Sequence, residues 1–119
     1  MTVRQDKVNS LLQREIAAFL VAEKPEGITG LVTVTGVDTA PNLESAKVFY
    51  SVVAQDFETV AAVLRQRIYE IQGMLMEKLV MRRVPRVTFI PDHSGEHAQH
   101  ISDLIHKLHK DDGEQGPEK

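Results

Sequence analysis

The chain has 119 residues, of which 42% are hydrophobic and 26% charged, so it is long enough for one globular domain with a single modest core. It contains no cysteine, which excludes disulfides and thiolate metal ligands. The net charge of −3 argues at face value against nucleic acid, and the charged N-terminus argues against a signal peptide or a membrane span there. We therefore expect a cytoplasmic protein without membrane contacts.

The first predicted element is an amphipathic helix from about Arg4 to Ala22, with its apolar residues on one face. A loop rich in proline and glycine follows. Segments 31–40 and 45–54 are rich in β-branched and aromatic residues, which predicts a β-hairpin, with Gly36 as a candidate for a bulge. In the second strand one face should hold Ala46, Val48, Tyr50 and Val52, and the other Lys47, Phe49 and Ser51.

The next helical pattern begins near Asp56 or Phe57 and extends to about Arg83, since Pro85 disfavours helix at the residue before it. Gly73 lies off the apolar face, on the side that a continuous helix would turn toward solvent. An exposed glycine inside a helix costs roughly 1 kcal/mol relative to alanine, so either Gly73 has no role or the helix breaks there. The apolar face consists of Val60, Leu64, Ile68, Ile71, Leu75 and Leu79.

The C-terminal part begins with a short strand over Arg86–Pro91, followed by a turn in which Ser94 is a candidate N-cap. Residues 110–119 contain no apolar side chain and are expected to form a disordered acidic tail. The order of elements predicts an α+β fold, with a layer of helices on a small sheet, as one domain over residues 1–109. A last amphipathic helix is predicted around Ile101, Leu104, Ile105 and Leu108.

One motif resembles a metal site. The segment "HSGEH", residues 93–97, matches the H-x-x-E-H pattern of inverted zinc proteases, but Ser94 and Gly95 stand where a helix is only beginning. Solvated histidines on a helix face are the better interpretation, so we expect no metal. The sequence also lacks a phosphate-binding glycine loop and a nucleophile elbow. We expect a protein that is not an enzyme, with no catalytic residue, cofactor or small-molecule substrate.

The charge is unevenly distributed along the chain. Residues 61–91 have a net charge of +4, and residues 92–119 a net charge of −4. Cations near residues 82–86 could simply complement a helix C-terminus and add solubility. The excess is larger than that role needs, which favours phosphate contacts confined to one surface. Because few exposed aromatic residues are predicted, recognition of the backbone or shape of structured RNA fits better than base stacking.

Three segments resemble the ribosome-binding factor A family: "LESAKVFYSV" at 43–52, "LVMRRVPRVTFIPDHS" at 79–94, and the ending "ISDLIHKL". The resemblance covers about residues 3–109. It implies a fold like the type II KH domain, with the glycine loop between two helices reduced to an alanine-x-glycine kink. Gly73 falls at the glycine of that kink, whereas Ile71 replaces the alanine and Met76 stands where an arginine is common.

The resemblance also implies a function. Such a protein would bind 16S rRNA on the free small (30S) ribosomal subunit, assist late maturation including the rRNA 5′ end, and matter for growth in the cold. We expect a monomer that stabilises one rRNA arrangement without covalent chemistry. The alternative is a protein-interaction module without direct RNA contact. The expected RNA contacts are Lys47, Arg65, Arg67, Lys78, Arg82, Arg83 and Arg86, with Arg4, Lys7 and Arg14 on the first helix as further candidates.

Overall fold

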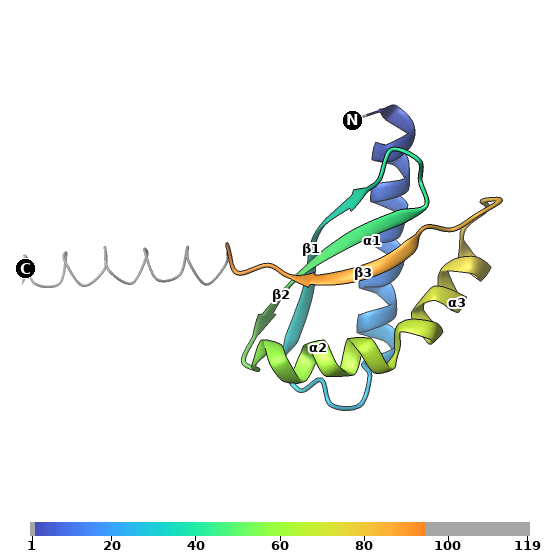
Figure 1. The fold of residues 1–119 in the computed structure, drawn as a ribbon. Coiled ribbons are helices and arrows are strands. Elements are labelled where there is room, and N and C mark those ends of the chain that lie inside the picture. Colours follow the sequence, from blue (N-terminus) through green and yellow to red (C-terminus); the bar gives the residue numbers. More distant parts are fainter. Residues whose placement is uncertain (1, 95–119) are drawn as a thin grey trace, which may run out of the picture.

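The computed structural model describes residues 2–94 of the chain, and Figure 1 shows the arrangement of their elements. The predicted α+β fold is confirmed in this part, and the predicted last helix and acidic tail lie outside it. A three-stranded sheet has the order β1-β2-β3, with β1 antiparallel and β3 parallel to β2. The elements are α1 (Val3–Glu23), β1 (Leu31–Thr39), β2 (Ser45–Val53), α2 (Phe57–Gln66), α3 (Ile68–Lys78) and β3 (Arg86–Pro91).

Helix α1 begins with a capping box. The Thr2 hydroxyl accepts a hydrogen bond from the Gln5 amide at 3.1 Å, and the Gln5 side chain accepts one from the Thr2 amide at 3.0 Å. The same Gln5 side chain donates to the carbonyl of Thr39 at 2.9 Å, which joins the start of α1 to the end of β1. The first turn of α1 is therefore fixed to the sheet at the end of β1.

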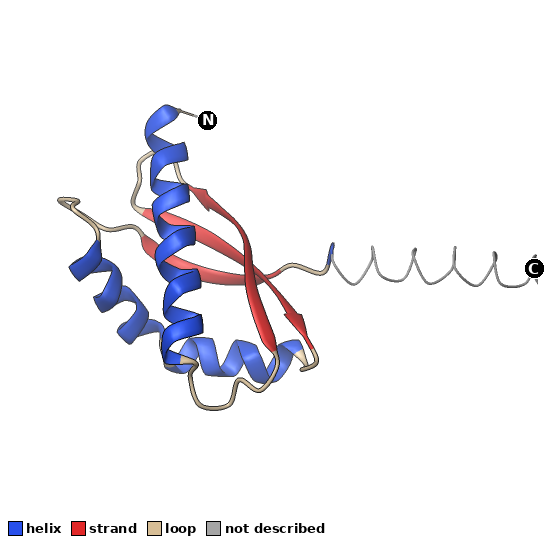
Figure 2. Ribbon diagram, turned by 180° about the vertical axis from the view of Figure 1, so that it is seen from behind, coloured by secondary structure: helices blue, strands red, loops and turns tan. Residues whose placement is uncertain are grey.

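The sheet has one face covered by helices, as the view from behind shows (Figure 2). The pairing register shifts between Val34 and Gly36, which confirms the predicted bulge. Ala46, Val48 and Tyr50 on β2 are at most 2% exposed and face the helices, as the alternation predicts. Their neighbours along β2, including the exposed Lys47, belong to the opposite face.

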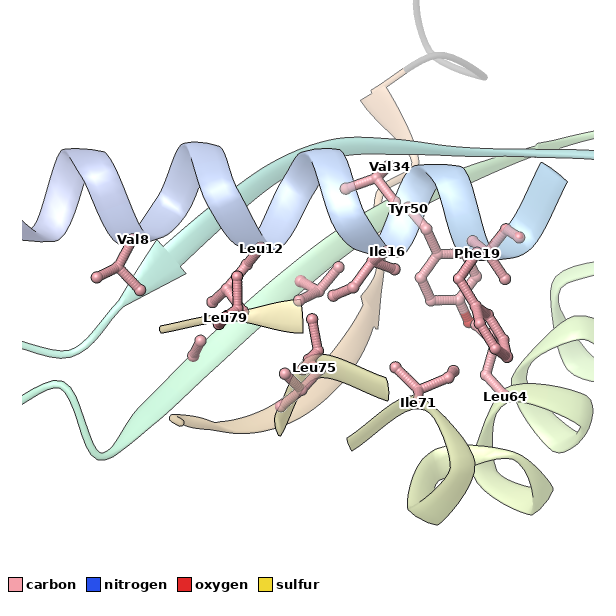
Figure 3. Close-up of a cluster of buried hydrophobic side chains, with 14 of the residues drawn as sticks. Val8, Leu12, Ile16, Phe19, Val34, Tyr50, Leu64, Ile71, Leu75 and Leu79 are labelled. Carbon is pink, nitrogen blue, oxygen red and sulfur yellow. The ribbon is translucent and has the colours of Figure 1, made fainter. Parts of the chain in front are cut away.

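The core lies between this sheet face and all three helices (Figure 3). Burial of apolar side chains is its main source of stability, at about 25 cal/mol for each Å² removed from water. Leu79 follows α3 and is also buried. The residues that are at most 1% exposed include Leu12 and Ile16 of α1, Val48 and Tyr50 of β2, Val60 and Leu64 of α2, and Ile71 and Leu75 of α3.

The predicted helix break at Gly73 is wrong. The chain leaves helical geometry at Arg67, with φ −98° and ψ 6°, and α3 then continues through Gly73 without interruption. That conformation is open to any residue, so no glycine is needed. The break allows α2 to cross one end of the sheet while α3 lies beside α1 (Figure 1). Gly73 does lie on the solvent-exposed side of the helix, as predicted.

The predicted helix extent is also wrong at its C-terminus, because α3 ends at Lys78 and not near Arg83. Leu79 is already extended, at φ −96° and ψ 132°. The reason is the position of β3. The Arg86 amide must reach the Glu44 carbonyl at 3.0 Å beside the start of β2, so the intervening segment has to turn back toward the sheet. Residues 79–85 make that connection.

Candidate nucleic-acid interface

Four of the predicted cations line one groove, which we call the basic groove. Arg4 and Lys7 come from the first turns of α1, and Arg82 and Arg83 come from the connection between α3 and β3. The groove has a volume of about 580 Å³ and is completed by the turn at 41–44 and by Val80 and Met81. All four cations are exposed, and two distant parts of the sequence bring them together.

The electrostatics of the basic groove leave its cations available. Only one carboxylate, Glu44, lines it, and the Arg83 guanidinium lies 3.6 Å from that group. Because the two side chains are 75% and 58% exposed, solvent weakens this ion pair and a phosphate could replace the carboxylate. The N-terminus of α1 adds the positive end of a helix dipole beside Arg4.

Lys47 and Arg86 lie on the sheet face that none of the described helices covers, at the same end of the fold. Arg86 pairs in register with Ser45, and Lys47 pairs with Thr88, so the two cations are diagonal neighbours across β2 and β3. Lys47 also has Asp38 of β1 directly opposite. Lys78 ends α3 just before the connection that carries Arg82. We call this group the basic end: Arg4, Lys7, Lys47, Lys78, Arg82, Arg83 and Arg86.

Three predicted contact residues lie away from the basic end, so the ten cations do not form one patch. Arg14 is midway along α1, with its guanidinium 3.5 Å from Glu15. Arg65 lies in the last turn of α2, and Arg67 lies at the α2–α3 break, paired with Glu70 at 2.8 Å. The α2–α3 junction is at the opposite end of the fold from the α1 N-terminus (Figure 1). RNA contact by any of the ten residues stays a prediction.

Acidic residues gather at the other end of the molecule. Glu23 ends α1, Glu26 follows in the next loop, and Asp56 and Glu58 begin α2. The side chain of Gln55 ties these segments together, since it donates to the Gly27 carbonyl at 2.6 Å and accepts from the Gly30 amide at 3.0 Å. We call these four acids the acidic end, which also carries the cations Lys24, Arg65 and Arg67.

A second hollow, of about 570 Å³, lies between α2 and β3. It is lined mostly by apolar side chains, with Arg65 and Tyr69 at its border. The Tyr50 hydroxyl is buried without a hydrogen-bond partner, and this burial raises the Tyr50 pKa, partly opposed by the charge of Arg65. Sequence reasoning missed this hollow, because strand alternation places Tyr50 in the core and says nothing about gaps between elements.

The metal motif has only its first residues in the described part of the chain. The ring of His93 packs on Phe57, with centroids 4.4 Å apart, and no group of three metal-ligating side chains occurs among residues 2–94. Glu96 and His97 lie outside that range. In the same part of the chain, no helix has the length and hydropathy required to cross a membrane.

The model of one protein family, described as ribosome-binding factor A, matches residues 4–105. The chain belongs to this family. Ribosome-binding factor A from Coxiella burnetii is 33% identical over 117 residues, covering 97% of this chain and 98% of the relative. The protein of the same name from Chlorobium luteolum is 34% identical over 118 residues, covering 96% and 98%.

Structures of family members show the same fold. The crystal structure of ribosome-binding factor A from Thermus thermophilus aligns with a TM-score of 0.67 at 22% identity, over 73% of this chain and 93% of that one. A homology model of the Thermus protein, fitted into a cryo-EM map of its 30S complex, aligns with a TM-score of 0.61 at 22% identity, over 71% and 91%. The KH-like fold is confirmed, and the family consists of non-enzymatic ribosome assembly factors.

Proposed function

We propose that this chain binds 16S rRNA on the free 30S subunit through its basic end and assists late maturation of the subunit in the cytoplasm, including the rRNA 5′ end. The observation that carries the proposal is the basic groove, in which Arg4, Lys7, Arg82 and Arg83 face one opening. Groups that point into one opening can contact several phosphates of a folded RNA at once. Family membership supplies the ribosomal context.

The mechanism we infer is differential binding. A monomer that fits one arrangement of the rRNA better than another shifts the population toward that arrangement and needs no covalent step. The breadth of the groove and the sheet-face position of Lys47 and Arg86 suit the backbone of a folded RNA, because these cations come from separate elements and do not follow one line.

Reversing two charges in the basic groove tests the proposal. The variant with Arg82→Glu and Arg83→Glu should bind purified 30S subunits at least about tenfold more weakly, with a less negative slope of log affinity against log salt. The measurement is co-sedimentation across a salt series. The matched control is Arg14→Glu with Arg65→Glu, which changes the net charge equally at exposed positions outside the basic end.

The control variant separates a contact made through the basic groove from a general effect of charge. Both variants should keep the far-UV circular dichroism and melting temperature of the original chain, because all four side chains are exposed. Equal loss of binding in both would show either a general charge effect or RNA contacts that include Arg14 and Arg65, and it would contradict a contact confined to the basic end. Unchanged binding in both, with no dependence on salt, would favour the alternative of a protein-interaction module without RNA contact.

A further inference from the structure

An exposed apolar strip runs along the outer side of α3, formed by Tyr69, Gly73 and Met76. The spacing of four and three residues places them on one side of a helix. Tyr69 is 88% exposed and Met76 66% exposed, whereas the opposite side of α3 carries Ile71 and Leu75 at 0%. We call these three residues the α3 strip. It faces away from the core that α3 helps to form.

The glycine in the middle of the α3 strip makes no close packing contact with residues 2–94. A Cβ atom built on Gly73 would meet nothing within 4 Å, so the residue is not required by close packing among the described residues. Gly73 also lies within α3, where the greater backbone freedom of glycine weakens the helix. What it does provide is a flat surface between two large apolar side chains, on which the backbone of another molecule can approach closely.

One flank of α3, beside the α3 strip, carries negatively charged side chains. Glu70 and Glu77 are seven residues apart, so they lie on the same flank of the helix, next to Gly73. Glu70 is paired with Arg67, and Glu77 has no ion pair among the described residues. Phosphates laid along the strip would approach both carboxylates. A cationic protein surface with apolar side chains complements this flank better than RNA does.

We propose that the α3 strip docks a helix of a basic protein of the small ribosomal subunit, at a contact separate from the basic groove. Tyrosine and methionine are enriched in protein interfaces, where tyrosine supplies a rigid anchor and methionine adapts to the partner. A helix can settle over Gly73 between Tyr69 and Met76, while its cations meet Glu70 and Glu77. This inference rests on the proposed function, because the partner is part of the 30S subunit.

Two variants test the contact without disturbing the fold. Met76→Glu places a charge in the strip, and Gly73→Gln fills the flat surface, where the structure leaves open space. Their matched controls are Val21→Glu and Ala18→Gln on the exposed side of α1, since Val21 is 78% exposed. Circular dichroism and melting temperature establish that each variant is folded before binding is measured.

The binding assay compares purified 30S subunits with protein-free 16S rRNA. Met76→Glu and Gly73→Gln should weaken binding to subunits by about fivefold or more, while binding to protein-free rRNA changes less than about twofold. Both controls should match the original chain. Equal weakening on the two probes, or no weakening on subunits, would overturn the inference. The variant with Arg82→Glu and Arg83→Glu should lose affinity for both probes, so failure of the proposed function is recognisable separately.

Site-specific crosslinking identifies the class of molecule on the strip. The full chain with Met76 replaced by the photoreactive p-benzoylphenylalanine is bound to 30S subunits and irradiated. The expected product is an adduct with a subunit protein that survives ribonuclease. An adduct with rRNA, a dimer of this chain, an internal crosslink to residues 95–119, or no adduct at all would each overturn the inference.

Discussion

The carboxyl group of Asp92 has a pKa well below its ordinary value. Its carboxylate accepts hydrogen bonds from the Thr35 hydroxyl at 2.6 Å and from the Ser94 amide at 2.9 Å. These bonds, the first above all, lower the pKa of Asp92 to about 2. They favour the charged form in the folded state, so their contribution to stability is complete above about pH 4 and disappears as the pH falls toward 2.

The Thr35→Val variant should therefore raise the pKa of Asp92 toward its ordinary value, because the strongest of these bonds is lost. Carboxyl chemical shifts followed by NMR from about pH 1.5 to about pH 6 would measure the change in the Asp92 pKa. Thr33→Val, at another exposed position of β1, is the matched control. An Asp92 that titrates near 4 in the original chain would contradict the hydrogen bonding described here.

Two glycines should respond to alanine in opposite directions. At Gly30 a Cβ atom would collide with the carbonyl oxygen of Val53, so Gly30→Ala should lower the free energy of unfolding by about 1–3 kcal/mol. At Gly73 the space is open and alanine favours the helix more than glycine does. Gly73→Ala should therefore raise the free energy of unfolding by about 0.5–1 kcal/mol. Urea denaturation would measure both. A loss of stability in Gly73→Ala would mean that the glycine has an internal role.

At the scale of elements, Gln72 holds α3 and β3 together. Its side-chain amide donates to the Pro85 carbonyl at 2.7 Å and accepts from the Val87 amide at 3.2 Å. Gln72→Met keeps the volume but removes both bonds, and should lower the free energy of unfolding by about 1–3 kcal/mol. Hydrogen exchange at the Val87 amide should become faster. The control is Gln66→Met at an exposed position, which should leave that amide unchanged.

The elements also show what sequence reasoning can reach. Hydrophobic periodicity predicted the buried faces of α1, α2 and α3, because burial is recorded in the spacing of apolar residues. The break at Arg67 could not be predicted, since its backbone conformation requires no particular residue. Nor could the basic groove, because Arg4 and Arg82 meet only after β3 has paired with β2.

At the scale of the whole molecule, the difference in charge between the two ends should orient the chain on the 30S subunit. The basic end and the acidic end lie far apart along the fold, so substitutions at the acidic end should hardly affect a contact made through the basic groove. Glu23→Lys with Glu26→Lys should leave the salt dependence of 30S binding nearly unchanged, with a slope within about one unit of the original. A much steeper slope in co-sedimentation would show that the acidic end also approaches RNA.

β3, the last of the described strands, completes one side of the sheet. β3 pairs with the central strand β2, and it places Val87 and Phe89 beside the β2 side chains, with the ring of Phe89 against that of Tyr50. A polypeptide that ends before Arg86 lacks these side chains, so we expect proteases to cleave it faster than the full chain. The end of β3 at Pro91 therefore marks how far the chain must extend before this side of the core is closed.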